Sequence, residues 1–281
     1  MKIFVTGGTG FVGRPITARL KRQKHQLLIL SRTVSGSDYL KGDLANIDQW
    51  RKELEKFRPD LIVHLAWEGI TNYHSAENSL RNLTYSVNFL KTAAEIGCRS
   101  FLGVGSCQEY SRKEGKLNEA LEPVPIDPFA FAKNALRFWG EKIAKEKEMQ
   151  FIWIRLFYAY GPGQKANSLI PYLIRCIKEK QEPVIKNPLG GNDFIYINDA
   201  ADLIALIIKK SKGRDGVYNV GSGKLTAVCE IMNQVYGKKD KYPKPKGYWA
   251  DISKVQKEFG WRPKIDIETG VKKTLEFYGI K

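Results

Sequence analysis

The eight residues at positions 6–13, TGGTGFVG, constrain the fold of this chain more than any other feature. They follow a short apolar run at 2–6 and precede a segment with helical periodicity. Gly7, Gly10 and Gly13 recur at three-residue spacing. Glycines permit a tight turn and let backbone amides approach a phosphate at the positive N-terminus of a helix. A strand, a glycine turn and a helix in this order predict a dinucleotide-binding unit.

The rest of the first half alternates apolar runs with helical patterns. The predicted strands are 2–6, 26–30, 61–66, 100–105 and 151–157, and the predicted helices are 11–24, 78–96 and 133–147. Strands that alternate with helices form a parallel sheet with helices on both faces. The expected fold class is therefore α/β, a Rossmann-type doubly wound parallel sheet.

After residue 163 the alternation becomes less regular. The segments 194–197 and 217–220 predict short strands, and 168–180, 200–210, 227–236, 253–259 and 268–278 predict helices. We expect a dinucleotide-binding Rossmann domain over 1–163, with 192–225 returning to it. The segments 164–191 and 226–281 then form a smaller, interleaved C-terminal lobe that binds the substrate.

Composition excludes several classes of protein. The chain is 43% hydrophobic and 27% charged, as in ordinary globular proteins. No apolar run approaches the roughly 18 residues of a membrane span, and the N-terminus has no signal-peptide pattern, so no membrane association and a cytoplasmic location are expected. The four cysteines form no CxxC pair and lie far from the three histidines. Free thiols and no metal site are expected.

The formal net charge of +16 favours anionic partners such as nucleotides, nucleotide sugars or nucleic acid. The densest basic stretch, 238–246, contains two prolines and is typical of a solvated loop. No nucleic-acid-binding motif accompanies the charge, so nucleic acid is not the expected partner. An RNA-associated role stays open on the charge alone.

The end of the second predicted strand bears on which cofactor fits. NAD sites usually carry an acidic residue there, which holds the ribose 2′-hydroxyl. This strand ends in Leu30, Ser31 and Arg32, without a carboxylate. A guanidinium can pair with a 2′-phosphate, so the sequence predicts NADP(H) in preference to NAD(H). The alternative is that Arg32 is an ordinary surface arginine.

The sequence resembles the extended short-chain dehydrogenases of the epimerase/dehydratase kind that act on nucleotide sugars. The resemblance covers nearly the whole chain. The motifs are TGGTGFVG at 6–13, GDL at 42–44, PDLIVHLA at 59–66, GS at 105–106, RLF at 155–157, YGPG at 160–163, DFIY at 193–196, YNVGSG at 218–223 and GWRP at 260–263. The resemblance implies a nucleotide-activated sugar as partner and a homodimer formed through 78–96 and 133–147. The implied cofactor-binding residues are Gly7, Gly10, Phe11, Val12, Gly13, Ser31, Arg32, Asp43, Leu44, Leu65, Ala66, Asn82 and Lys133.

In that family a Ser or Thr bonds the substrate oxygen, a Tyr passes the proton, and a Lys holds the nicotinamide ribose. Ser106 and Lys133 match two of these positions, but the Tyr position holds Phe129. Phenylalanine has no hydroxyl and cannot relay a proton. Three interpretations remain: an enzyme with another donor, a form inactivated by replacement of a native Tyr, or a protein that binds without turnover. Tyr158 is the first substitute donor to consider, although ordinary packing also accounts for it. Cys107 and Tyr73 are weaker candidates.

Local patterns narrow the expected reaction. The segments 64–69, HLAWEG, and 170–177, IPYLIRCI, resemble the CDP-abequose and CDP-paratose synthase branch, which are 4-keto-sugar reductases that use NADPH. Cys107 and Gln108 replace the Asp-Glu pair of the family's 4,6-dehydratases. The predicted function is an NADP(H)-dependent reductase or epimerase of a 4-keto-6-deoxy nucleotide sugar, with hydride transfer at C4. The alternative is a catalytically weak protein that binds nucleotide sugar or NADPH.

Overall fold

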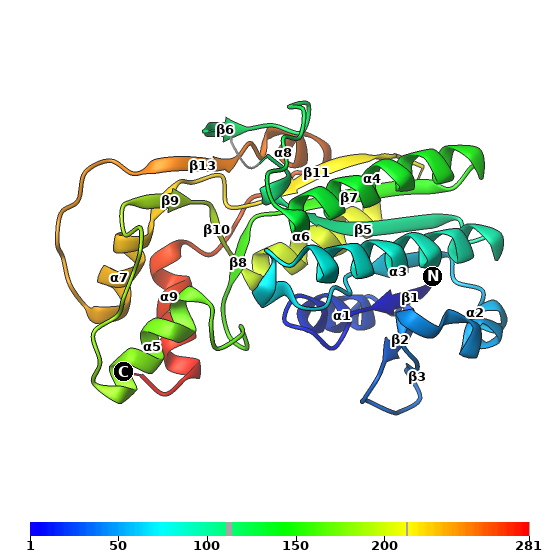
Figure 1. Ribbon diagram of the computed structural model, residues 1–281, viewed down its shortest axis with the longest axis horizontal. Helices are drawn as coiled ribbons and strands as arrows, with labels where there is room; N and C mark the ends of the chain where they lie inside the picture. Colours follow the sequence, from blue (N-terminus) through cyan, green and yellow to red (C-terminus); the bar gives the residue numbers. More distant parts are fainter. Residues whose placement is uncertain (111–113, 212, 281) are drawn as a thin grey trace. The chain divides into compact units, whose positions relative to one another are not determined.

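The computed structural model describes residues 1–110, 114–211 and 213–280 (Figure 1). The chain divides into two compact units, of which the first comprises Met1–Arg112, Glu122–Arg155 and Ile204–Tyr218, and the second Lys113–Leu121, Leu156–Leu203 and Asn219–Lys281. This division differs from the predicted boundaries. Residues 156–163 belong to the second unit because the strand at 158–160 pairs with the strand at 194–196. Of the returning segment 192–225, only 204–218 belongs to the first unit.

A seven-stranded sheet has the order β11-β7-β5-β4-β1-β2-β3. Its strands are β1 (Lys2–Thr6), β2 (Gln26–Ser31), β3 (Tyr39–Lys41), β4 (Leu61–His64), β5 (Ser100–Ser106), β7 (Gln150–Leu156) and β11 (Gly216–Val220). Pairings from β3 through β2, β1 and β4 to β5 are parallel. The chain winds outward from β1 through β2 to β3, and from β4 through β5 and β7 to β11 on the other side. The predicted doubly wound Rossmann-type sheet is confirmed.

The helices of the first unit include α1 (Gly13–Arg22), α2 (Arg51–Phe57), α3 (Ala76–Glu95) and α4 (Pro128–Glu146), and α6 (Ile197–Lys210) is shared by both units. Helices α3 and α4 run alongside each other (Figure 1). Helix α4 begins five residues earlier than predicted because Asp127 caps it: the Asp127 carboxylate accepts a hydrogen bond from Ala130 N at 2.8 Å, and Pro128 occupies the first turn. Phe129 and Lys133 therefore lie one turn apart on one helix.

A row of aromatic rings fills the core beneath β5 and β7. Phe101 stacks on Phe151 with ring centroids 6.1 Å apart, and Phe151 stacks on Trp153 at 6.0 Å. Gly103 makes room for this row, because a Cβ there would lie 2.5 Å from the Trp153 ring. The indole of Trp153 is thereby fixed with its N–H toward the carboxyl end of β5, where the site residues lie.

In the second unit, β8 (Tyr158–Tyr160) pairs with β10 (Phe194–Tyr196), and a second sheet has the order β12-β9-β13-β6. The strands of that sheet are β6 (Gly115–Leu117), β9 (Gly190–Asn192), β12 (Thr226–Ala227) and β13 (Lys246–Ala250), and the helices are α5 (Leu169–Glu179), α7 (Val228–Tyr236), α8 (Ser253–Phe259) and α9 (Ile267–Phe277). The buried Asp193 carboxylate accepts hydrogen bonds from the backbone amides of Ser222, Gly223 and Ala250, and so joins three segments of this unit.

Composition led to expectations about thiols, membrane spans and metal sites. Cys98, Cys107, Cys176 and Cys229 are buried free thiols, as expected. No helix in the described part of the chain is long and apolar enough to cross a membrane. Among those same residues, no group of three or more His, Cys, Asp or Glu side chains is placed to hold a metal ion.

Candidate active site

The glycine loop lies at the carboxyl ends of β1 and β4, where the winding of the sheet changes direction. Dinucleotides bind at this switch point in doubly wound folds. Gly7 has φ +71°, and a Cβ there would lie 2.6 Å from Ala66 N in the loop after β4. A Cβ on Gly13 would lie 2.1 Å from Gly7 O. The backbone of this loop is therefore too closely packed for any residue other than glycine at these two positions.

Gly10 is different, and it tests whether a dinucleotide fits here. It is exposed, and a Cβ on it would meet only Gly7 O, at 3.3 Å. The protein itself leaves space at this position that a side chain would occupy. Helix α1 begins after Val12 with no side-chain cap and no acidic residue in its first turn. Its amides and positive dipole end, flanked by Phe11 and Val12, fit a pyrophosphate.

Two carboxylates lie beside Arg32 in the structure. The guanidinium forms an ion pair with Glu68 and lies 3.7 Å from the Asp43 carboxylate. The strand β2 itself ends without a carboxylate, but the fold brings these two there from other segments. Ser31 holds the turn, because its hydroxyl accepts hydrogen bonds from the amides of Thr33 and Val34.

The neighbouring cofactor candidates Asp43 and Leu44 lie after β3. Asp43 caps a 3-10 helix that begins at Leu44 and accepts a hydrogen bond from Ala45 N at 2.9 Å. A second Asp43 carboxylate oxygen faces Arg32. These two contacts place the Asp43 carboxylate beside the end of β2.

Asn82, a predicted cofactor residue on α3, holds the loop after β4. Its amide nitrogen donates to Glu68 O at 3.2 Å and to Asn78 O at 2.7 Å, and its carbonyl oxygen accepts from Glu68 N at 2.7 Å. These bonds use both N–H donors of the side-chain amide and one lone pair of its oxygen. Asn82 thus shapes the loop that carries Leu65, Ala66 and Trp67.

Ser106 ends β5. Its hydroxyl oxygen accepts a hydrogen bond from Gln108 N at 3.1 Å, which leaves the hydroxyl proton to be donated to another acceptor. Its own amide donates to the Glu109 carboxylate at 3.0 Å. Ser106 is therefore positioned through both its side chain and its backbone.

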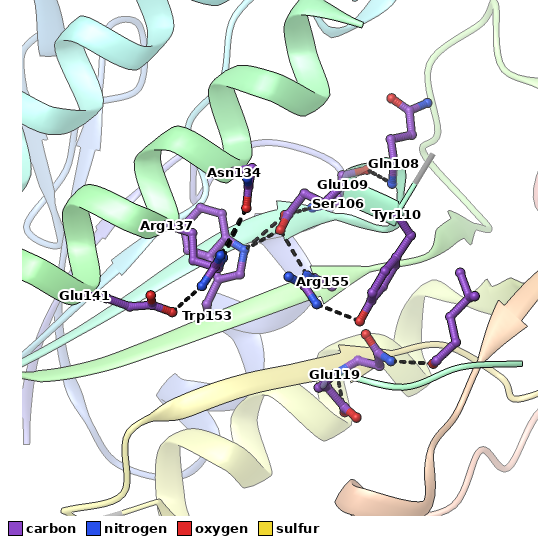
Figure 2. A network of polar contacts seen from close by, with 12 residues as sticks. Ser106, Gln108, Glu109, Tyr110, Glu119, Asn134, Arg137, Glu141, Trp153 and Arg155 are labelled. Carbon is purple, nitrogen blue, oxygen red and sulfur yellow. Dashed lines mark hydrogen bonds and ion pairs between the residues drawn. The ribbon is translucent and has the colours of Figure 1, made fainter. Parts of the chain in front are cut away.

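Glu109 is the centre of a buried polar network beneath Ser106 (Figure 2). Besides the Ser106 amide, its carboxylate accepts hydrogen bonds from Trp153 Nε1 and Arg155 Nε, each at 3.0 Å. Arg155 also donates to the Tyr110 hydroxyl at 2.7 Å. Sequence reasoning did not identify Glu109, although the signal was present: a carboxylate three residues after Ser106 and an arginine within the apolar run 151–157.

Lys133 lies on α4 in an aromatic environment, almost completely buried. Its ammonium donates a hydrogen bond to Val104 O at 2.7 Å. The Trp67 ring centroid lies 3.9 Å from Nζ and the Phe129 ring centroid 5.8 Å. Trp67 and Phe129 meet edge to face with centroids 5.6 Å apart. The predicted site residues Lys133 and Phe129 thus lie close together. Trp67, which was not predicted as a site residue, contacts both of them.

Burial sets the electrostatics around this lysine. Loss of hydration lowers the pKa of Lys133 to about 7, and the negative charge of Glu109 opposes that change. The pKa of His64, at the end of β4, is lowered to about 3 by burial and by the charge of Lys133. The His64 ring nitrogens bond the hydroxyls of Thr6 and Ser86, at 2.8 and 2.9 Å. His64 is a neutral structural residue that joins β1, β4 and α3.

A protein-family model and two relatives match this chain in sequence. The model of the NAD dependent epimerase/dehydratase family matches residues 3–221. The chain belongs to this family. A relative from Aggregatibacter actinomycetemcomitans, dTDP-6-deoxy-L-talose 4-dehydrogenase (NAD(+)), is 25% identical over 256 residues, which cover 88% of this chain and 93% of the relative. GDP-6-deoxy-D-talose 4-dehydrogenase from the same organism is 29% identical over 75% of this chain and 71% of the relative.

Solved structures agree on the fold. UDP-glucose 4-epimerase from Thermotoga maritima, solved with UDP-glucose, has a TM-score of 0.86 at 22% identity, covering 99% of both chains. UDP-glucuronic acid 4-epimerase from Bacillus cereus, solved with UDP-glucuronic acid and NAD, has a TM-score of 0.87 at 21% identity, also covering 99% of both chains. As a member of the epimerase/dehydratase family, the chain is an enzyme.

In this epimerase/dehydratase family member, Phe129 has no hydroxyl and cannot relay a proton. Three other side chains were considered as proton donors in its place. Cys107 is buried directly after Ser106, and Tyr73 is exposed beside His74. Tyr158 lies on β8 of the second unit, with its hydroxyl 3.3 Å from that of Tyr248. The first unit alone therefore offers a hydroxyl donor at Ser106, a buried cation at Lys133 and a cradle for a pyrophosphate.

Proposed function

We propose that this enzyme is an NADP(H)-dependent reductase or epimerase of a 4-keto-6-deoxy nucleotide sugar, with hydride transfer at sugar C4. The observation that carries the proposal is Ser106: its oxygen already accepts a bond from Gln108 N, so its proton is directed to an acceptor such as a keto oxygen. The two talose relatives are named as 4-dehydrogenases of 6-deoxy sugars, and oxidation at C4 is the reverse of 4-keto reduction. Within the family, we place the enzyme with the 4-keto-sugar reductases of the CDP-abequose and CDP-paratose synthase kind.

The residues of the first unit have distinct roles in this proposal. The nicotinamide cofactor supplies or accepts the hydride when bound. The loop containing Gly7, Gly10 and Gly13 binds the pyrophosphate, and Asp43 with Leu44 borders the adenine. Lys133 holds the nicotinamide ribose, and Ser106 donates its hydroxyl proton in a hydrogen bond to the sugar oxygen. The second unit serves as the substrate-binding lobe.

The preference for NADP(H) rests on Arg32. Its ion pair with Glu68 is exposed, and such pairs contribute about 1 kcal/mol or less, so a 2′-phosphate can displace Glu68. Titration calorimetry should give tighter binding of NADPH than of NADH. Arg32→Ala should weaken NADPH alone, and Glu68→Gln should tighten NADPH by removing a competing carboxylate. Equal affinities for the two dinucleotides, or tighter NADH, would refute the preference.

Phe129→Tyr tests the reaction itself. The substitution adds one hydroxyl beside Lys133 and should raise NADPH-dependent reduction of 4-keto-6-deoxy nucleotide sugars at least about tenfold, a conservative part of what acid–base catalysis supplies. Phe277→Tyr is the matched control, because Phe277 is exposed on α9, outside the proposed dimer surface, and it should change nothing. If wild type is already fast and Phe129→Tyr no faster, another group donates the proton, with Tyr158 the first to test.

A second candidate function is favoured by the surroundings of Lys133. The missing hydroxyl at Phe129 and the indole over the lysine both suit a protein that binds nucleotide sugar or NADPH without turnover. Wild type and Phe129→Tyr that bind NADPH but reduce no sugar of the panel would establish this function in place of the reductase.

We also propose that the enzyme is a cytoplasmic homodimer. Its four free thiols suit a reducing compartment. Helices α3 and α4 expose large apolar side chains at Leu80, Phe131, Phe138 and Trp139. Exposed apolar groups gathered on two adjacent helices are typical of a surface that a second copy covers.

A further inference from the structure

The ammonium of Lys133 is covered in a way that the proposed function does not require. An ammonium has three N–H donors. Within residues 1–110, 114–211 and 213–280, Val104 O is the single hydrogen-bond acceptor that Lys133 Nζ contacts. The Trp67 ring lies closest among the aromatic groups, 3.9 Å from Nζ, which is within the range of a strong cation–π contact. The indole therefore takes the place of a polar partner.

Two further contacts keep Trp67 in this position. Asn82 fixes the backbone of the next residue, Glu68, through a hydrogen bond to its amide and one to its carbonyl. The Phe129 ring meets the indole edge to face, with an interplanar angle of 87°. Edge-to-face aromatic pairs add stabilisation beyond the area that they bury. The residue that replaces the family's tyrosine is thus also the residue against which the indole rests.

We propose that Trp67 is a positioning residue that caps Lys133, and that a nicotinamide dinucleotide must displace the indole from the ammonium in order to bind. The inference rests on the proposed function, in which Lys133 holds the nicotinamide ribose. A cation–π contact with a desolvated ammonium is favourable, so breaking it opposes binding. The apparent affinity of a ligand falls in proportion to the fraction of protein in the open state.

A graded series at position 67 tests the cap. Trp67→Leu keeps an apolar side chain without a ring, and Trp67→Phe keeps a ring that binds cations less strongly than indole. We expect NADPH affinity, measured by calorimetry on the full chain, to increase about five- to thirtyfold in Trp67→Leu and less in Trp67→Phe. Phe277→Leu, which removes an exposed aromatic ring on α9, outside the proposed dimer surface, is the control and should leave affinity unchanged.

A second measurement needs no cofactor. Reductive methylation of the chain, followed by mass spectrometry, reports how accessible each lysine is. Lys133 should react faster in Trp67→Leu than in wild type, with exposed Lys142, whose ammonium lies 5.5 Å from the Phe138 ring centroid, as internal reference. Thermal unfolding of each variant verifies that the fold is retained, and Trp67→Phe serves where Trp67→Leu loses it.

The outcomes separate the two proposals. Binding of NADPH that is unchanged or weaker in folded Trp67→Leu overturns the cap, because the indole is then neutral or part of the cofactor site. Slower or equal methylation of Lys133 overturns it as well. If neither dinucleotide binds wild type or any variant, the proposed function fails, and the inference fails with it.

Discussion

Glu109→Gln removes the negative charge at the centre of the buried network in Figure 2 while it preserves the size of the side chain. The glutamine oxygen can still accept from the Ser106 amide, but its NH₂ group then faces Arg155 Nε, also a donor. Glu109 and Arg155 are 0% and 1% exposed, so the arginine charge stays buried without its counter-ion. Removing one partner of a buried ion pair costs about 3–5 kcal/mol. Domains of this kind have a free energy of unfolding of only about 5–15 kcal/mol.

The expected loss is therefore large enough to measure by thermal unfolding. At about 2–4 °C per kcal/mol, Glu109→Gln should lower Tm by about 6–20 °C. Glu141→Gln is the matched control, because it makes the same substitution in a partly exposed pair with Arg137, which contributes about 1 kcal/mol or less. The double variant Glu109→Gln/Arg155→Met removes both charges and should recover more than half of the loss.

Two results would refute this reasoning. A Tm within about 2 °C of wild type in Glu109→Gln would mean that the carboxylate does not stabilise Arg155. A double variant no more stable than the single one would mean that the loss does not come from an unpaired cation. A further consequence follows for the site, since Glu109 raises the pKa of Lys133: its removal should lower that pKa further.

Gly10→Val should abolish NADPH binding without changing the circular dichroism, because its side chain would enter space that the protein leaves open; normal binding would exclude the loop as the phosphate site. The pKa of Lys133 is lowered from 10.5 to about 7, so the unfolded chain holds more protons than the folded one between these values. The stability of wild type relative to Lys133→Met should therefore rise between pH 7 and 10, and a constant difference in urea midpoints would contradict this sign. Trp139→Glu should dissociate the proposed dimer in sedimentation experiments, whereas a monomeric wild type would rule that dimer out.

The local sequence was sufficient for the strand before the glycine loop and for one helix of the second unit. The strand Lys2–Thr6 and helix Ser253–Phe259 have their predicted bounds, because apolar periodicity and turn residues act over a few neighbours. The start of α4 at Pro128 was also encoded locally, by the capping residue Asp127 and by Pro128 itself. The predicted start at 133 was too late because the first turn is apolar and does not show the amphipathic pattern of the rest of the helix. Gly7, Gly10 and Gly13 predicted a dinucleotide-binding loop because they stand between a strand and a helix, and that context is local in the sequence.

Only the tertiary structure decided what surrounds each charged group of the site. Arg32 pairs with Glu68 and Glu109 with Arg155 because β2, β4, β5 and β7 belong to one sheet. Lys133 meets Trp67 because α4 packs against β5 of that sheet. These partners are far apart in the sequence, and no local pattern relates them. The burial of Lys133 depends on packing from several segments at once. This burial lowers the pKa of Lys133, and it places the ammonium against the Trp67 indole instead of water.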